Sequence, residues 1–523
     1  MPLPQGSETV STWMTTDIPR TEKLNENITV DVCVVGAGIA GLTTAYLLAL
    51  EGKKVCVIEM SEIGSGQTGK TTAHFSTSID DYYYKMQKVH GTEGIKIIAD
   101  SFRASIEKVH SIVKFENIDC EMERVPGFLF QNDHETDLLE KELKAAHAAG
   151  LDEVKLADYA PFMSFDTGPC LSFPQQLQLH PLKYLKGLTE AIYKRGGQIF
   201  TQTHVDKIED GDEPTVKTTE GFYVKAQAVV VATNSPINNL FTIHTKQAPY
   251  RSYVIGALIP KGSMPKALYW DTEDPYHYLR ITHENDVHDV LIIGGEDHKT
   301  GQGLAPHARF DRLEAWARER FPFMGNVLYR WSGQVMEPVD GVAYLGRNPG
   351  NKNVYIITGD SGEGMTHCTI GAMINTDLIM GRENPWKELY DPARVSLRSA
   401  GEFMKENLNV AYQYTDYIGG HNEQSVKELP KEEGIILSRG LKKIAVYKDA
   451  QGQLEMRSAV CPHLGCIVAW NSVEKSWDCP CHGSRFNCSG GVIEGPAVDD
   501  LEKLKEEDNY PVPESERPLL NKS

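Results

Sequence analysis

The sequence lacks the features that would place it in a membrane, outside the cell or on nucleic acid. No stretch approaches the roughly 18 consecutive apolar residues of a membrane-spanning helix. The segment Met1–Thr29 is polar and has neither a twin arginine nor the apolar core of a secretory signal. Lysines and arginines form no cluster, and the formal net charge is −19, which disfavours binding to the phosphate backbone of a nucleic acid. We therefore expect a cytoplasmic protein with no integral membrane segment and no nucleic-acid partner.

The composition is otherwise that of a globular protein with more than one domain. Hydrophobic residues make up 41% and charged residues 24% of the chain, which excludes a disordered or fibrous protein. A chain of 523 residues exceeds what one core organises, because domains typically contain about 100–200 residues. Half of the ten cysteines are concentrated near the C-terminus, between Cys461 and Cys488. That concentration indicates a dedicated chemical site.

A nucleotide-binding unit is predicted near the N-terminus. The apolar strand Val32–Val35 leads into the glycine motif Gly36-Ala-Gly-Ile-Ala-Gly41, a helical pattern follows as far as Leu50, and a second strand spans 55–59. The first glycine permits a tight turn, the second lets a pyrophosphate approach the backbone, and the third lets the helix pack closely. Glu59 ends the second strand, where its carboxylate can accept hydrogen bonds from ribose hydroxyls. The pattern alone is compatible with FAD or NAD, and a purely structural glycine turn is the alternative.

Farther along the chain, helix and strand patterns alternate and then give way to strands. A helix at Leu182–Lys194 is followed by a hairpin-like pair of strands and the apolar run Ala228–Ala232. Residues 250–296 have the β-branched and aromatic alternation of an antiparallel sheet. Sheets of both kinds predict an α/β nucleotide-binding domain with an inserted α+β substrate domain.

Two short segments near the C-terminus have the composition of a metal site. Residues 461–466 read C-P-H-L-G-C, and residues 479–484 read C-P-C-H-G-S. Each segment offers a thiolate and an imidazole, so together they can hold one iron by two sulfurs and another by two nitrogens. A structural zinc site is the alternative, although C-x-H paired with C-x-x-H is not a usual zinc spacing. The predicted ligands of the [2Fe–2S] cluster are Cys461, His463, Cys479 and His482.

Six further segments carry a family resemblance. In chain order they are His180–Leu185, Val229–Asn234, Leu291–His298, Arg330–Gln334, Asp340–Arg347 and Thr358–Gly364. Their sequences and order resemble the FAD-dependent amine and amino-acid oxidoreductases of the D-amino-acid oxidase and glycine oxidase superfamily, over most of residues 30–380. The resemblance implies an α/β FAD-binding domain that is Rossmann-like and of the glutathione-reductase type. Only one G-x-G-x-x-G motif is present, so no second, nicotinamide-binding domain is expected.

This resemblance implies the cofactor-binding residues position by position. The glycine motif and Glu59 would hold the ADP half, and Val205 would pack near the adenine. Residues 362–365 would bring backbone amides near the flavin ring, where a helix N-terminus can stabilise the negative charge of a reduced flavin. The full implied set is Gly36, Gly38, Ile39, Ala40, Gly41, Glu59, Thr71, Thr72, Val205, Ala232, Thr233, Gly362, Gly364 and Met365.

One loop departs from the family pattern. Relatives often have a Ser-Gly-Arg-Asn-Gly-Gly type of sequence where this chain has Thr68-Gly-Lys-Thr-Thr-Ala-His74. Some relatives attach the flavin covalently through a His or Cys of such a loop, so His74 is a candidate attachment point. We favour the alternative, in which the flavin is not attached and His74 is uninvolved or only supports the residues around it.

The C-terminal segments resemble a Rieske domain of the cytochrome bc-complex type, an all-β fold. The resemblance implies that Cys466 and Cys481 pair as a disulfide and that Gly495-Pro-Ala497 covers the cluster. Phe486 occupies the place where respiratory Rieske domains commonly have a tyrosine that donates a hydrogen bond to a ligand sulfur. The loss of that hydrogen bond predicts a reduction potential below that of the respiratory proteins.

Together these features predict an FAD-dependent amine or amino-acid dehydrogenase, or an oxidase-like enzyme, that passes electrons to the Rieske cluster. A flavin accepts two electrons and releases them one at a time, and the cluster carries one. The expected partners are a small amine or amino-acid substrate and an unidentified electron acceptor. Since arginine binds carboxylates bidentately, the candidate substrate-binding residues are Arg251, Tyr253, Arg280 and Arg330, with surface salt bridges as the alternative for each arginine.

Other functions fit the sequence less well. A Rieske oxygenase needs a mononuclear iron held by two histidines and a carboxylate, whereas residues 1–425 have a flavoprotein pattern. A pure electron carrier needs no large substrate domain, yet residues 80–330 supply one. The remaining alternative is a Rieske-linked electron-transfer protein or reductase in which the flavin is not an amine oxidant.

The predicted domain division follows from these patterns. The FAD-dependent domain takes its FAD-binding parts from about 30–80, 180–240 and 330–385, with the substrate-domain parts between them. A helix is expected within 386–418, followed by a polar linker at 419–425. The units are an N-terminal extension at 1–29, the FAD-dependent oxidoreductase domain at 30–385, a helix and linker at 386–425, the Rieske domain at 426–512 and a tail at 513–523.

Overall fold

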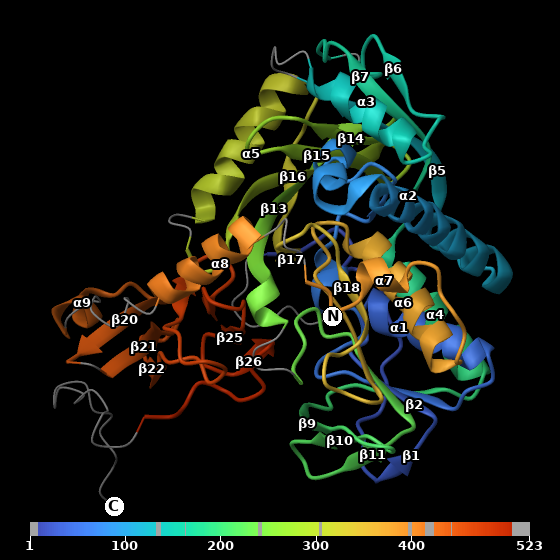
Figure 1. The fold of residues 1–523 in the computed structure, drawn as a ribbon. Helices are drawn as coiled ribbons and strands as arrows, with labels where there is room; N and C mark the ends of the chain where they lie inside the picture. The colour runs from blue at the N-terminus through green and yellow to red at the C-terminus, as the bar shows by residue number, and fades with distance from the viewer. Residues whose placement is uncertain are drawn as a thin grey trace, which may run out of the picture.

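The computed structural model describes residues 9–131, 137–162, 164–238, 243–302, 306–395, 400–413, 423–440 and 442–504. Figure 1 shows a large N-terminal region with two main layers of sheet and helix, and a smaller C-terminal region of short strands beside it. No helix within the described residues combines the length and the hydropathy of a membrane-spanning segment.

A six-stranded sheet forms the nucleotide-type layer, in the order β18-β19-β12-β2-β3-β8. Neighbouring strands are parallel except β18, which is antiparallel to β19. The central strands are runs of valine and other apolar residues with no exposed position, as expected of parallel strands covered on both faces. The strands are β2 (Val32–Val35), β3 (Val55–Ile58), β8 (Gln198–Phe200), β12 (Ala228–Val231), β18 (Tyr344–Arg347) and β19 (Val354–Thr358).

Helices cover one face of this sheet and a small sheet covers the other. Val32 and Val34 of β2 pack into the core formed with α1 (Ile39–Leu50), α4 (Pro181–Lys194) and α6 (Gly364–Ile379). The alternate residues Cys33 and Val35 pack against the small sheet β1-β11-β10-β9. Its strands are β1 (Ile28–Thr29), β9 (Val205–Glu209), β10 (Thr215–Thr218) and β11 (Tyr223–Lys225). The predicted strand–turn–helix unit and the helix at Leu182–Lys194 are confirmed, the latter beginning one residue earlier.

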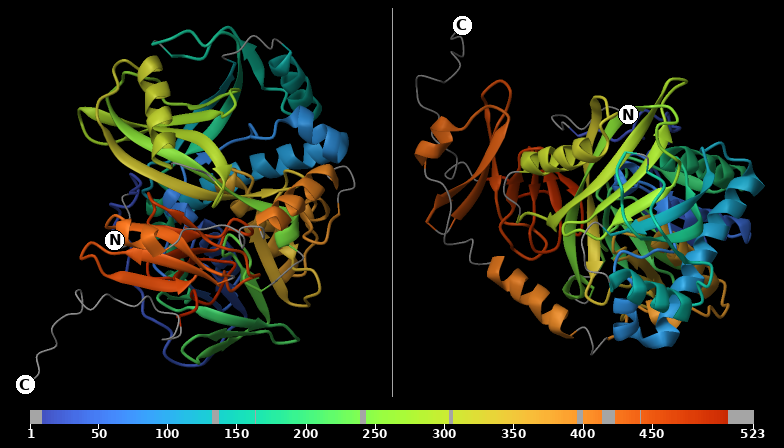
Figure 2. Two further views of the ribbon diagram at one scale, coloured as in Figure 1. Left: turned by 90° about the vertical axis from the view of Figure 1, so that its left-hand side faces the viewer. Right: turned by 90° about the horizontal axis from the view of Figure 1, so that it is seen from above.

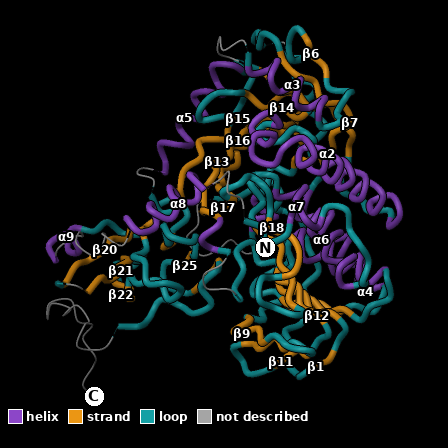
Figure 3. The backbone as a smooth tube through the Cα atoms, viewed as in Figure 1, coloured by secondary structure: helices purple, strands orange, loops and turns teal. Residues whose placement is uncertain are grey.

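A nine-stranded, mainly antiparallel sheet forms the substrate-type layer. Its order is β17-β13-β16-β15-β14-β5-β7-β4, with β6 paired to β7, and this confirms the antiparallel sheet predicted over residues 250–296. The strands are β4 (His74–Phe75), β5 (Glu123–Phe130), β6 (Lys155–Ala157), β7 (Cys170–Gln178), β13 (Gln247–Pro260), β14 (Leu268–Asp271), β15 (His277–His283), β16 (His288–Lys299) and β17 (Val327–Pro338). Figure 3 shows this layer flanked by α2 (Tyr83–Glu116), α3 (Leu138–Ala148) and α5 (Pro306–Arg320).

No local sequence pattern predicts α2, which is the longest helix among the described residues. Its periodic signal is interrupted, because Gly91 has a φ of 73° and marks a kink where two helical segments meet. Tyr83 and Tyr84, at its start, are also residues that are common in strands.

The C-terminal region contains two small antiparallel sheets, and its described residues, 423–440 and 442–504, include no long helix. The sheets are β20-β21-β22 and β23-β24-β25-β26, which agrees with the short strands of an all-β Rieske domain. Its strands are β20 (Glu433–Arg439), β21 (Lys442–Lys448), β22 (Leu454–Ser458), β23 (Ala469–Asn471), β24 (Ser476–Asp478), β25 (Arg485–Asn487) and β26 (Val492–Glu494). Figure 2 shows this region resting along one side of the N-terminal region.

Three helices precede these sheets: α7 (Lys387–Tyr390), α8 (Ala400–Gln413) and α9 (Glu423–Glu428). A helix, α8, thus lies within residues 386–418. Of the linker predicted at 419–425, residues 419–422 lie outside the described residues, and 423–425 form the start of α9 instead. The polar sequence Glu423-Gln-Ser425 reads as a linker by composition, but Val426 and Leu429 anchor the turn in a small apolar core. The tail predicted at 513–523 lies outside the described residues.

Candidate functional site

A cavity of about 880 Å³ opens at the carboxyl ends of the parallel strands. Gly36 follows β2, Glu59 follows β3, and Ala232 and Thr233 follow β12, and all four line this cavity. Nucleotides bind at such an edge in open α/β sheets, because the strand ends leave a crevice there. The cavity continues from this edge to the face of the nine-stranded sheet and to the C-terminal region.

The glycine motif forms the turn that the sequence predicts. Gly36 has a φ of 107°, and a Cβ on it would lie 2.4 Å from the carbonyl oxygen of Ala232. A Cβ on Gly41 would lie 1.8 Å from the carbonyl oxygen of Gly36. Gly38 is the N-cap of α1 and lines the cavity, so the N–H groups at the start of the helix can approach an anion. This backbone fits a pyrophosphate.

Glu59 is held at the cavity wall by its own neighbours. Its two carboxylate oxygens accept hydrogen bonds from the backbone N–H groups of Ala37 and Ser61, each at 2.8 Å. Burial raises the pKa of this carboxyl, and the two backbone hydrogen bonds oppose the rise. Glu59 lines the cavity, and each of its carboxylate oxygens retains a lone pair that can accept a further hydrogen bond. The ribose contact stays a prediction, and the geometry is suitable for it.

The structure brings the implied FAD residues together. All of them line the cavity except Gly41, which packs beneath the turn. Gly362, Gly364 and Met365 lie at the N-terminus of α6, while Thr71 and Thr72 follow the short helix η1 (Gln67–Lys70). Segments that are far apart in sequence therefore form one continuous lining of a size suited to FAD, although their individual roles stay predictions.

His74 lines the same cavity with both ring nitrogens engaged. Nδ1 lies 3.0 Å from the hydroxyl of Thr72, and Nε2 lies 3.4 Å from the carbonyl oxygen of Leu279. Burial, assisted by the positive charge of Arg280, lowers the pKa of His74 to about 3. Because both ring nitrogens are engaged, a supporting role is favoured, and the absence of covalent attachment stays a prediction.

The four candidate substrate-binding residues lie outside the cavity lining. Arg280 is buried, and its Nη1 donates to backbone carbonyl groups, including that of Ala73 at 2.8 Å. Tyr253 stacks on His298 beneath α5. Arg330 is half-exposed and pairs with Glu314. Their substrate-binding role stays a prediction, and the site described below is built from other residues.

Arg251 belongs instead to a charged interface between the two regions of the chain. Its guanidinium donates to Ser332 at 2.7 Å and lies 3.9 Å from Glu474 and 4.0 Å from Asp478, both in the C-terminal region. Although burial acts in the opposite direction, neighbouring cations lower the pKa of both carboxyl groups to about 2. Paired and buried charges of this kind fix one docking arrangement, because separating them would leave each uncompensated.

The C-terminal region also supplies part of the cavity wall. Arg485, whose side chain is only 1% exposed, donates to Glu494 at 2.9 Å, and both residues line the cavity. Lys70, the neighbour of the implied FAD residue Thr71, lies 3.6 Å from Glu494. These contacts could not be predicted from the sequence, since nothing in a local pattern indicates which domain surface a charged residue faces.

The end of the cavity at the nine-stranded sheet is lined by carboxylates and aromatic rings. Trp270, Tyr276 and Tyr278 come from β14 and β15 or the turn before β15. The hydroxyl of Tyr276 lies 3.4 Å from Asp80 Oδ2 and 3.5 Å from Asp297 Oδ2. This acidic end, defined as the cavity-lining residues Asp80, Asp297, Glu363, Trp270, Tyr276 and Tyr278, is absent from the sequence prediction.

The carboxyl groups of the acidic end are held above their ordinary pKa values. Burial, together with the charges of Asp81 and Asp297, raises the pKa of Asp80 to about 7. Burial raises the pKa of Asp297 to about 6. Burial and the charge of Asp80 also raise the pKa of Glu363. Such crowding of like charges stabilises a cation bound among them.

The four predicted cluster ligands converge in the C-terminal region. The sulfur atoms of Cys461 and Cys479 lie within hydrogen-bonding reach of each other. The rings of His463 and His482 have centroids 5.0 Å apart, and the two nitrogens of His463 have no hydrogen-bond partner among the described residues. Burial lowers the pKa of His463 to about 4 and that of His482 to about 3, which leaves neutral imidazoles. Two thiols and two neutral imidazoles are a donor set that fits a Rieske cluster.

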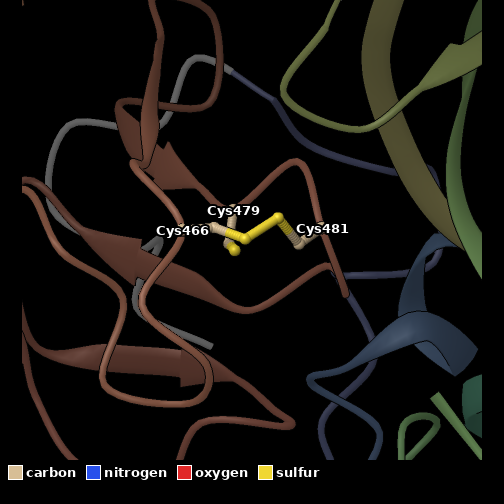
Figure 4. A group of neighbouring side chains, drawn as sticks. All are labelled: Cys466, Cys479 and Cys481. Atoms are coloured by element: carbon tan, nitrogen blue, oxygen red, sulfur yellow. A yellow bond between two sulfur atoms is a disulfide. The ribbon is translucent and has the colours of Figure 1, made fainter. Parts of the chain in front are cut away.

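A disulfide joins Cys466 and Cys481, as the Rieske resemblance implies. Figure 4 shows this bond with the side chain of Cys479 beside it, and the sulfurs of all three lie within 4.8 Å of one another. The hydroxyl of Ser484 accepts a hydrogen bond from the backbone N–H of Ala497 at 3.0 Å. The loop predicted to cover the cluster is therefore tied to a ligand segment.

Comparison with known proteins decides the family. A model of the FAD-dependent oxidoreductase family matches residues 31–378. The chain belongs to that family. A model of the Rieske [2Fe–2S] domain matches residues 422–505. The cofactors of this flavoprotein are therefore FAD and a Rieske [2Fe–2S] cluster, which decides against the zinc alternative.

Relatives share either the whole architecture or the flavoprotein part of it. YhfW of Bacillus subtilis (strain 168), whose name describes a Rieske 2Fe–2S iron–sulfur protein, is 30% identical over 94% of this chain and 97% of its own. Gamma-glutamylputrescine oxidoreductase of Escherichia coli (strain K12) is 28% identical over 69% of this chain and 86% of its own. Glycine oxidase from Geobacillus kaustophilus shares the fold with a TM-score of 0.60 at 16% identity, covering 70% of this chain and 99% of the oxidase.

Proposed function

We propose that this flavoprotein oxidises a small cationic amine and passes the electrons one at a time to its Rieske cluster. The observation that carries the proposal is the acidic end of the cavity, where carboxylates and aromatic rings lie together. A carboxylate attracts an ammonium group, and aromatic rings add a cation–π attraction. A positively charged amine therefore fits the acidic end better than a negatively charged group would.

The cations near the cavity support an amine over an amino acid as the substrate. Among the described residues that line it, the lysine and arginine side chains are Lys70 and Arg485. Both are already paired with carboxylates of the C-terminal region, at Glu474 and Glu494. A substrate carboxylate would compete with these buried pairs. The relative named for gamma-glutamylputrescine, an amine derivative, agrees with this preference.

The proposed reaction is a two-electron oxidation of the amine. The C–H bond next to the amine nitrogen breaks and its hydride leaves with two electrons, while a proton leaves the nitrogen, so the amine becomes an imine. When bound, FAD accepts a hydride and releases electrons singly, and a [2Fe–2S] cluster carries one electron. The two electrons finally leave, in two steps, to an external one-electron redox protein, and the proton that remains from the hydride is released to the solvent. In this proposal Asp80 accepts the ammonium proton, for which a pKa near 7 is well matched.

The chain places the two cofactor sites next to each other, which supports transfer between them. Residues of the C-terminal region, including Arg485 and Glu494, line the flavoprotein cavity. Fusion in one chain also keeps the two sites at a high effective concentration.

The Asp80→Asn substitution is expected to weaken amine binding. A hydrogen bond to a charged group contributes about 1.5–3 kcal/mol, so KM for an amine such as putrescine should rise about tenfold or more. In the unmodified enzyme kcat/KM should fall as the pH drops below about 7, because the pKa of Asp80 is raised and its carboxylate becomes protonated. Steady-state kinetics across pH measure both effects.

A matched control is Asp152→Asn, which makes the same change at an exposed position outside the cavity. It should leave KM and the pH profile unchanged. An Asp80→Asn enzyme with the parent KM and pH profile for putrescine, or a parent enzyme that oxidises glycine but no simple amine, would contradict the proposed substrate class.

A further inference from the structure

One histidine of the flavoprotein region lies against both histidine ligands of the cluster. The ring centroid of His244, in the short helix η2 (His244–Lys246), is 4.8 Å from that of His463 and 5.7 Å from that of His482. Both contacts are edge-on, with interplanar angles of 80° and 63°. His244 is 3% exposed, so its ring fills the space at this junction and covers part of the surface of the two ligand rings.

The opposite side of His244 leads to the flavin cavity. Its Nδ1 lies 3.5 Å from the hydroxyl of Ser235. Ser235 lines the cavity together with Ala232 and Thr233, which follow strand β12. A continuous series of contacts therefore runs from the cavity wall through His244 to the imidazoles of the cluster.

The ligand segment at 479–484 is held against the flavoprotein region from the same side. Gln334, which lines the cavity, donates from Nε2 to the carbonyl oxygen of Gly483 at 3.0 Å. Thr300 in turn donates to Gln334 Oε1 at 3.2 Å. A Cβ on Gly483 would lie 2.7 Å from Pro249, so no side chain fits between these surfaces. The imidazole side of the cluster site thus faces the flavoprotein region.

We propose that His244 is the positioning residue that couples the Rieske cluster to the flavin. This inference rests on the proposed function, in which one of the two electrons taken from the amine moves to the cluster. That step reduces one iron from the ferric to the ferrous state. The second electron follows once the cluster has passed the first to the external one-electron redox protein. The ring of His244 supplies the packed contact for this step and shields the imidazoles from water.

Removal of the His244 ring has two effects that act in opposite directions on the rate of cluster reduction. In His244→Ala the contact between the cavity wall and the ligand rings is lost, so cluster reduction should slow about tenfold, as for other residues that support metal ligands. Water can then approach the ligands and stabilise the more negative reduced cluster, so its potential should shift to more positive values. The more positive potential of the cluster would by itself make electron transfer from the flavin faster. Slower transfer despite that more positive potential therefore identifies a coupling role for His244.

The test uses the full chain with both cofactors bound. Anaerobic rapid mixing with putrescine follows flavin absorbance and the electron paramagnetic resonance signal of the cluster, and a redox titration gives the cluster potential. His244→Phe retains an aromatic ring and should keep most of the parent rate. His147→Ala, on α3 away from both sites, should match the parent.

The outcomes separate this inference from the proposed function. Slower cluster reduction with unchanged flavin reduction in His244→Ala, and recovery in His244→Phe, support the coupling role. A parent-like rate and potential in His244→Ala overturn it. If the parent cluster is not reduced after putrescine has reduced the flavin, the proposed function fails. In that case the potential of His244→Ala alone decides whether the ring shields the cluster.

Discussion

Gly38→Glu is expected to yield a folded protein without FAD. The backbone at Gly38 caps α1 and faces the cavity, and a Cβ there would already lie 3.1 Å from the hydroxyl of Thr68. A glutamate side chain would project toward the place where the pyrophosphate must approach the helix N-terminus, adding bulk and a repelling negative charge. The yellow flavin absorbance of the purified protein should therefore be lost.

The control for this variant is Gly401→Glu, the same change on the exposed surface of α8. Nothing lies within 4 Å of a Cβ built at Gly401, and glutamate is a better helix former than glycine. This control should retain full FAD. Circular dichroism separates loss of FAD from loss of the fold. A folded Gly38→Glu protein with a full complement of FAD would refute the assignment of the glycine motif.

Cys479→Ser is expected to remove the Rieske cluster while FAD is retained. The thiolate of Cys479 is one of the two predicted sulfur donors, and backbone N–H groups of Cys481 and His482 point toward it. A serine hydroxyl is a harder and less acidic donor, so the iron should be lost or bound weakly. The visible absorbance and the paramagnetic signal of the reduced cluster should disappear, and iron analysis should approach zero.

Cys488→Ser provides the matched control in the same domain. Cys488 is a half-buried free cysteine outside the ligand segments, and its replacement should leave iron content and spectra unchanged. Both variants should bind FAD like the parent, because neither cysteine lines the cavity. A Cys479→Ser protein with the parent iron content and spectrum would mean that the ligand set is assigned incorrectly.

The sequence indicates both cofactors because the residues that suggest each of them lie close together in the chain. A tight turn needs glycine at Gly36, whose φ of 107° favours a residue without a side chain, and the neighbouring strand is a short apolar run. The cluster ligands likewise lie in two short segments whose composition alone indicates iron–sulfur chemistry. Such patterns can be recognised in a single sequence, since each depends on residues a few positions apart.

The acidic end of the cavity could not be predicted in the same way. Asp80, Tyr276 and Asp297 meet only because the nine-stranded sheet folds over the cavity, and each would look like an ordinary polar residue in its own segment. Arg251 illustrates the converse. Its residue type indicates a substrate carboxylate, but the structure places it against Glu474 and Asp478 of the other domain. Contacts between distant segments decide both cases.

We propose that the flavin and the cluster act in series, with electrons entering at the flavin. The most direct test is anaerobic rapid mixing of the full chain with a reducing amine, with flavin absorbance and the paramagnetic signal of the cluster recorded on one time axis. We expect flavin bleaching first and the cluster signal afterwards, and no cluster signal in FAD-free Gly38→Glu protein. Cluster reduction in the FAD-free protein at the parent rate would show that electrons do not enter at the flavin.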